Sequence, residues 1–126
     1  LRKRLTENPQ ADIEGFKKYY INHLYSKAMF YDSISFVLTG RHVAHSLLLH
    51  HNLVAGLFLD DLIAHFKANG WNVVDARIAF NDPIYNTLTN TVPAGESLTW
   101  SMAKQSGKFE SILPKEINTK KIKWTR

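Results

Sequence analysis

Residues 43–53 read Val-Ala-His-Ser-Leu-Leu-Leu-His-His-Asn-Leu, an apolar run that ends in two adjacent histidines and an asparagine. A short leucine-rich run that is bounded by polar residues and flanked by helical patterns is typical of a buried parallel strand. In α/β proteins the chemistry lies at the carboxyl end of such strands, because the loops that leave them meet there. The sequence therefore predicts a buried strand with His50 and His51 at its functional end.

The segments on both sides of this run show helical spacing. Apolar residues recur every three or four positions from Ile13 to Leu38 and predict a long helix over about 10–38 that ends at Gly40. Asn52 is a good N-cap for a second helix, which Asn69-Gly70 would end. The run 71–75 then predicts a second short strand, so that residues 43–75 form one strand, helix, strand unit.

The pattern becomes less regular after this unit. A short helix is predicted around residues 75–80 and is broken by Asn81-Asp82-Pro83. Ser97 is the expected cap of one more helix over 98–104. Residues 106–126 are expected to form an irregular basic tail.

Composition limits the class of protein. The 126 residues fit one domain, and 44% hydrophobic residues are enough for a packed core. No apolar run approaches the roughly 20 residues that cross a bilayer, so no membrane span is expected. Cysteine is absent, which excludes disulfides and thiolate metal sites.

The net charge of +5 is confined to the carboxyl-terminal part. Residues 103–126 contain seven basic and two acidic side chains, whereas residues 1–102 are balanced. A soluble terminus is the commoner explanation of such a tail, and nucleic-acid binding is the weaker alternative. We therefore expect no nucleic-acid partner.

Five histidines fall between positions 42 and 65, which raises the question of a metal site. Side chains alternate faces along a strand, so His45 and His51 would point one way and His50 the other. His42 and His45 would enter the strand about 15 Å from His50, which argues against a metal site made of these histidines alone. His42, His45 and His65 are instead expected to be solvated or hydrogen-bonded.

His50 is the candidate catalytic residue. At the tip of a buried strand its imidazole would face a cleft floored by leucine, where it could act as a general acid or base. His51 is expected to face away from that cleft. Asp60-Asp61 is expected on the polar face of its helix, and Ser46 lacks the Gly-x-Ser-x-Gly context of a serine hydrolase.

Several segments together resemble a known family. They are Gly40-Arg41-His42-Val43-Ala44-His45-Ser46-Leu47-Leu48-Leu49-His50-His51-Asn52, then Phe58-Leu59-Asp60-Asp61-Leu62, Gly70-Trp71 and Asp82-Pro83-Ile84-Tyr85. In this order and spacing they resemble the carboxyl-terminal part of the polysaccharide deacetylase (NodB-type) family. The similarity covers roughly the first hundred residues.

The resemblance implies a metal-dependent de-N-acetylase on a distorted (β/α) barrel. In that scheme zinc or another divalent ion, held by one aspartate and two histidines, polarises the acetamide carbonyl and the attacking water. Carried over to this chain, His50 resembles the general acid and Leu48 the apolar wall beside the acetyl methyl. The amino-terminal Asp-Asp and His-x-x-x-His motifs have no counterpart here, so this chain alone is expected to bind no metal.

The predicted fold is therefore α/β, the carboxyl-terminal part of a distorted (β/α) barrel, with a long amino-terminal helix and about two parallel strands. Residues 1–105 would form the incomplete barrel and residues 106–126 the basic tail. The expected function is hydrolysis of the acetamido C–N bond of N-acetylated glycans, completed by the missing amino-terminal part of the same domain. The alternative is a non-catalytic carbohydrate- or partner-binding remnant. The family implies a periplasmic or secreted location.

Overall fold

The fold is taken from a computed structural model that describes residues 1–91 and 97–109. The chain divides into two compact units, Leu1–Thr87 and Leu88–Arg126. The first unit contains α1 (Arg2–Glu7), α2 (Glu14–Thr39), α3 (Leu53–Ala68), α4 (Ala76–Ala79) and the 3-10 helix η1 (Pro83–Asn86). The second contains α5 (Leu98–Ser106).

Both long helices of the first unit end where local chemistry predicts, and α3 also begins there. Helix α2 begins at Glu14, about four residues after the predicted start, and the Ile13 side chain makes no capping bond. Helix α2 ends at Gly40, whose φ of 74° is left-handed and whose N–H bonds to the carbonyl of Phe36. The Asn52 side chain accepts the Ala55 N–H at 3.0 Å and caps α3. The predicted long helix, the Asn52-capped helix and its end at Asn69-Gly70 are therefore confirmed.

The shorter helices also follow their capping residues. Asp75 caps α4, and Asp82 caps η1 with Pro83 in its first turn. The Ser97 hydroxyl accepts the Trp100 N–H at 3.1 Å and begins α5. The predicted helices near 75–80 and after Ser97 are confirmed.

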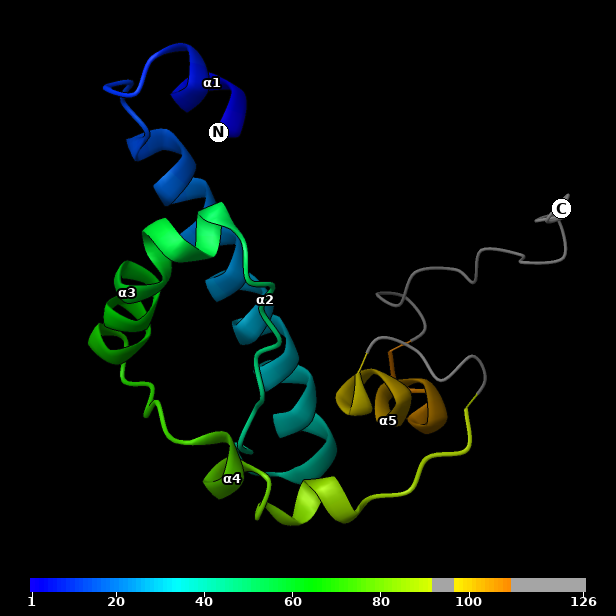
Figure 1. The fold of residues 1–126 in the computed structure, drawn as a ribbon. Coiled ribbons are helices and arrows are strands. Elements are labelled where there is room, and N and C mark those ends of the chain that lie inside the picture. Colours follow the sequence, from blue (N-terminus) through cyan, green and yellow to red (C-terminus); the bar gives the residue numbers. More distant parts are fainter. Residues whose placement is uncertain (92–96, 110–126) are drawn as a thin grey trace, which may run out of the picture. The chain divides into compact units, whose positions relative to one another are not determined.

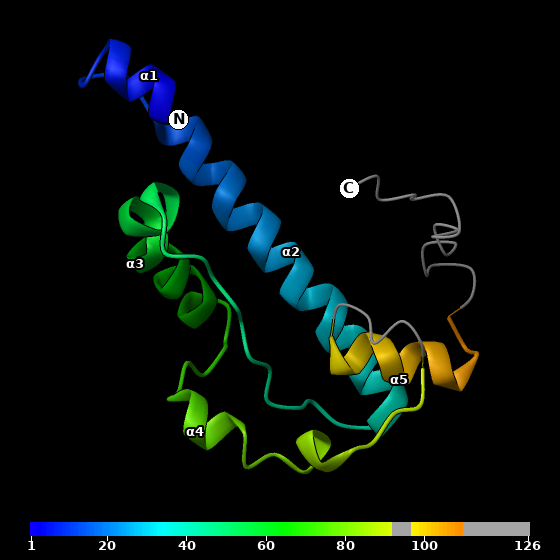
Figure 2. The same ribbon diagram turned by 45° about the vertical axis from the view of Figure 1, so that its right-hand side comes forward.

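Helices α2 and α3 pack together and carry the core of the first unit. Phe58, Leu62 and Phe66 lie on the buried face of α3. Tyr20 and Tyr25 of α2 contact the Phe58 and Phe66 rings at centroid distances of 6.3 and 5.4 Å. Figures 1 and 2 show segment 41–52 running back from the end of α2 to the start of α3, which then runs in the same direction as α2.

The predicted α/β fold is wrong. Residues 1–91 and 97–109 contain no strand, so neither 43–53 nor 71–75 belongs to a parallel sheet or to a barrel fragment. A strand needs a neighbour to pair its backbone groups, and backbone groups of Ala44 and Trp71 bond elsewhere. The Ala44 N–H bonds to the Asp82 carboxylate, and the Trp71 N–H bonds to the Phe66 carbonyl at the end of α3.

The leucines of the predicted strand are not buried either, since Leu47 and Leu48 are 49% and 89% exposed. The predicted tail lies outside the described residues from 110 onward, and the predicted domain boundary at 105 stays a prediction. Within the part of the chain that is described, no helix is both long and apolar enough to cross a bilayer.

Candidate functional site

The candidate residues lie on segment 41–51, which connects α2 to α3. This segment is extended and has no regular secondary structure. Contacts with α2 and with the Asp82-Pro83-Ile84-Tyr85 segment fix its first residues, and the cap of α3 at Asn52 fixes its end.

Asp82 is the main anchor at the start of the segment. Its carboxylate accepts two hydrogen bonds from the Arg41 guanidinium, one of them at 2.8 Å. It also accepts the N–H groups of Ala44 and Ile84, each at 2.9 Å. The Arg41 guanidinium and these backbone donors favour the charged form, which holds the pKa of Asp82 well below its usual range.

Tyr85 adds a second contact to the same residue. Its hydroxyl donates to the Ala44 carbonyl at 3.1 Å. The Phe80 ring packs edge-on against the Tyr85 ring at 4.9 Å, which holds the phenol in place. Both backbone groups of Ala44 are therefore held by side chains about forty positions later in the chain.

A third anchor is Asp32, a buried carboxylate on α2. Its Oδ2 lies 2.8 Å from His42 Nδ1, and its Oδ1 lies 3.3 Å from His45 Nε2. The Asp32 side chain is 12% exposed, against 19% for His45 and 75% for His42. The two histidines therefore provide the partners that a buried carboxylate requires.

The predicted hydrogen bonding of His42 and His45 is confirmed, but their common partner Asp32 was not predicted. The available signal was an acidic residue next to the apolar positions Tyr31 and Ile34 of a long helix. An aspartate there needs a polar partner inside the fold.

This cluster does not form a serine-hydrolase triad. Ser35 Oγ and Asp32 Oδ1 both approach the same atom, His45 Nε2, at 3.4 and 3.3 Å. A triad needs the carboxylate on one ring nitrogen and the hydroxyl on the other. Ser35 is also fully buried and donates to the carbonyl of Asp32.

The metal implied by the resemblance does not fit the described residues. Within residues 1–91 and 97–109 no group of three histidine, aspartate or glutamate side chains is arranged to hold a metal ion. In the Asp32 cluster one ring nitrogen of each histidine, Nδ1 of His42 and Nε2 of His45, lies within hydrogen-bonding distance of a carboxylate oxygen, so the cluster is a hydrogen-bonded anchor.

His50 and Leu48 lie on the exposed part of the segment. His50 and His51 are both exposed, and Leu48 is 89% exposed. The described residues therefore do not form the leucine-floored cleft expected beside His50. The structure brings His50 close to the capped start of α3, and the catalytic role of His50 stays a prediction.

The other candidates are placed as follows. Asp60 and Asp61 are exposed on α3, as predicted. His65 packs edge-on against Tyr25 with ring centroids 4.7 Å apart. Ser46 is exposed.

Comparison of the chain with protein-family profiles, with curated proteins and with solved structures finds no match.

Proposed function

We propose that this chain is the carboxyl-terminal part of a metal-dependent de-N-acetylase of N-acetylated glycans, and that it supplies His50 as the general acid. The observation that carries the proposal is the contact between Ala44 and the Asp82-to-Tyr85 segment. The two segments that contribute most to the family resemblance lie about forty residues apart in sequence, and they hold each other directly. A functional unit assembled from these motifs requires such a contact.

The anchoring pattern also supports a role for His50. Residues 41–45 are held by Asp82, Tyr85 and Asp32, and the segment ends at the Asn52 cap. His50 lies between these two fixed ends and is exposed. A proton donor needs both a defined position and access to the substrate.

The chemical step assigned to His50 is proton transfer to the departing nitrogen. A base in the amino-terminal part of the domain would take a proton from water, and the water oxygen adds to the acyl carbon. The C–N bond then breaks, and acetate and an amine are formed. The amine nitrogen takes the proton from His50, because imidazole is the side chain that carries and releases a proton near neutral pH. Leu48, two residues earlier and exposed, would provide the apolar wall beside the acetyl methyl.

A divalent metal, if bound in the complete enzyme, would supply polarisation of the acetamide carbonyl and of the attacking water. Its ligands would come from the amino-terminal part of the domain, because the described residues offer no suitable group. The lack of a metal-binding group among the described residues also favours a second candidate function, that of a non-catalytic glycan- or partner-binding remnant.

The test is acetate release from N-acetylated oligosaccharides by the complete domain, in which this chain is combined with the part that carries the metal ligands. We expect His50→Ala to lower kcat by about 10²- to 10⁴-fold, the usual contribution of a general acid. His51→Ala is the matched control, since His51 is the adjacent histidine and is also exposed, and it should keep nearly full activity.

Full activity of His50→Ala would overturn the assignment of the acid. Glycan binding without acetate release by the unsubstituted complete domain would favour the non-catalytic candidate instead.

A further inference from the structure

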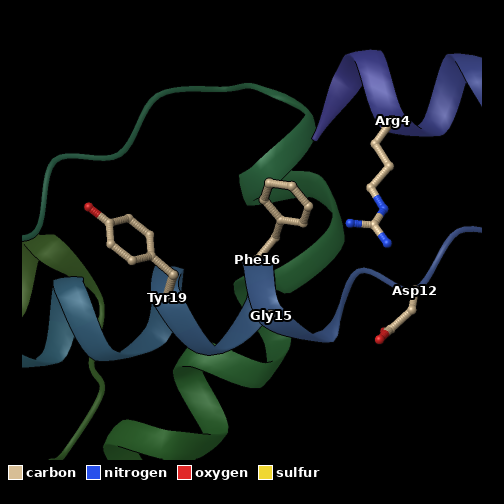
Figure 3. A pocket seen from close by; sticks show the side chains of 5 residues that line it. All are labelled: Arg4, Asp12, Gly15, Phe16 and Tyr19. Atoms are coloured by element: carbon tan, nitrogen blue, oxygen red, sulfur yellow. The ribbon is translucent and has the colours of Figure 1, made fainter.

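A hollow of about 550 Å³ lies between α1 and the first turns of α2, away from the contacts that anchor segment 41–51. Arg4, Asp12, Gly15, Phe16 and Tyr19 line it (Figure 3). Nothing in the proposed function uses these residues.

Two aromatic rings form the apolar wall of the hollow. Phe16 and Tyr19 are three residues apart and therefore neighbours on the surface of α2. They are 37% and 72% exposed. The Tyr19 ring stacks on His23 with centroids 5.7 Å apart and an angle of 13° between the planes, which defines the orientation of the phenol.

The rim carries one positive and one negative side chain. Figure 3 shows the Arg4 guanidinium reaching from α1 toward the space beside Phe16, with Asp12 on the connection that precedes α2. Asp12 Oδ1 accepts the Glu14 N–H at 2.9 Å. No ion pair between Arg4 and Asp12 is found among the residues that the structure describes.

Gly15 leaves the space open between the aromatic wall and the rim. A Cβ atom built at Gly15 meets nothing within 4 Å. A longer side chain at this position would project into the open space without displacing the backbone, which provides a way to block the hollow.

The combination of groups selects the chemistry of the ligand. A small anion would meet Asp12 and a small cation would meet Arg4, so neither net charge is favoured. A purely apolar ligand would offer no hydrogen-bond partner to the Arg4 guanidinium or to the second carboxylate oxygen of Asp12. A ligand that fits should therefore carry no net charge and should offer hydrogen-bonding groups. A neutral sugar ring does both, because its C–H face packs on an aromatic ring while its hydroxyls bond to the guanidinium and the carboxylate.

The hollow lies at the same end of the α2 and α3 pair as His50. Tyr20, next to Tyr19, contacts Phe58 in the second turn of α3. Figures 1 and 2 show the start of α3 beside the first half of α2, and His50 lies three residues before that start. We propose that the hollow binds one sugar ring of the N-acetylated glycan, next to the acetylated sugar whose departing nitrogen His50 would protonate. The identity of this glycan rests on the proposed function.

The test is binding of a water-soluble tetramer of β-1,4-linked N-acetylglucosamine to the unmodified chain, followed by amide chemical shifts. The sugar should shift the amides of residues 12–20. Tyr19→Ala should weaken binding by about five- to tenfold, the value of one aromatic contact. Gly15→Gln should weaken it at least as much, because the added side chain occupies the open space of the hollow. Val37→Ala is the matched control, because Val37 is 57% exposed near the other end of α2, and its affinity should stay within about twofold.

The absence of binding, or equal affinity in Tyr19→Ala, Gly15→Gln and the unmodified chain, would overturn the subsite. These results leave the acetate-release assay of His50 unaffected, so that failure of the subsite and failure of the proposed function are distinguishable.

Discussion

Replacing Asp82 by alanine removes the strongest anchor of segment 41–51. The side chain is 11% exposed and accepts the N–H groups of Ala44 and Ile84, each at 2.9 Å. It also pairs with the Arg41 guanidinium. One residue thus joins two positions of segment 41–51, Arg41 and Ala44, to η1.

The expected loss of stability follows from the two backbone donors. Loss of the capping bond to Ile84 costs about 1 kcal/mol. The part-buried N–H of Ala44 is left without its acceptor, which costs about 1–3 kcal/mol. Asp82→Ala should therefore lower the free energy of unfolding by about 2–4 kcal/mol, a large share of the about 5–15 kcal/mol of a typical domain.

The assay is equilibrium unfolding in urea followed by far-ultraviolet circular dichroism, together with hydrogen exchange at the Ala44 amide. Asp75→Ala is the matched control. Asp75 also caps a short helix and pairs with an arginine, but its partner Arg77 is only two residues away and its side chain is 46% exposed. We expect a much smaller effect for Asp75→Ala, and faster exchange of the Ala44 amide only in Asp82→Ala.

Equal stabilities of Asp82→Ala and Asp75→Ala would refute this reasoning. So would unchanged exchange of the Ala44 amide in Asp82→Ala, since the long-range contact would then not hold the segment.

Two further predictions concern ionisable groups. Because the pKa of Asp82 is held below its ordinary value of 3.8, the stability it confers is complete above about pH 5 and is lost as the pH falls toward the folded-state value. Urea unfolding between neutral pH and acid should show this loss in the unmodified chain, and Asp82→Ala should reduce the slope of stability against pH. Burial raises the pKa of Tyr20, whose hydroxyl has no hydrogen-bond partner among the described residues. Tyr20→Phe should therefore leave the free energy of unfolding unchanged or raise it by up to about 1 kcal/mol. A marked loss of stability would show that the hydroxyl does make a hydrogen bond.

The helices were predictable because their signals are local. The apolar spacing between residues 13 and 38, the left-handed Gly40 and the Asn52 cap act within one or two turns. Such interactions do not depend on what lies elsewhere in the fold. The predicted boundaries accordingly agree with the observed ones within a few residues, and most closely at the caps.

The strands were not predictable because a strand is defined by its partner. The leucine run at 47–49 and the valines at 73–74 favour extended backbone, but no neighbouring strand pairs them in the residues described. A short apolar run says that a segment prefers to be buried, and it does not say whether a surface to bury it exists.

The candidate site shows the same division. Sequence alone singled out His50 and Leu48 by their position after an apolar run and by a resemblance, and the structure leaves both exposed. The sequence could not show that Asp32 holds His42 and His45, because these histidines lie ten and thirteen positions after Asp32 and belong to a different element.

The sequence by itself thus determined helices α2, α3, α4 and α5, the caps at Gly40, Asn52 and Ser97, and the position of the basic residues, since each depends on neighbours along the chain. The short helices α1 and η1 were not predicted. Only the tertiary structure decided that segment 41–51 stays outside a sheet and is anchored by Asp32, Asp82 and Tyr85. The physical reason is that backbone groups and buried carboxylates must find partners, and the fold alone determines which partners come within reach.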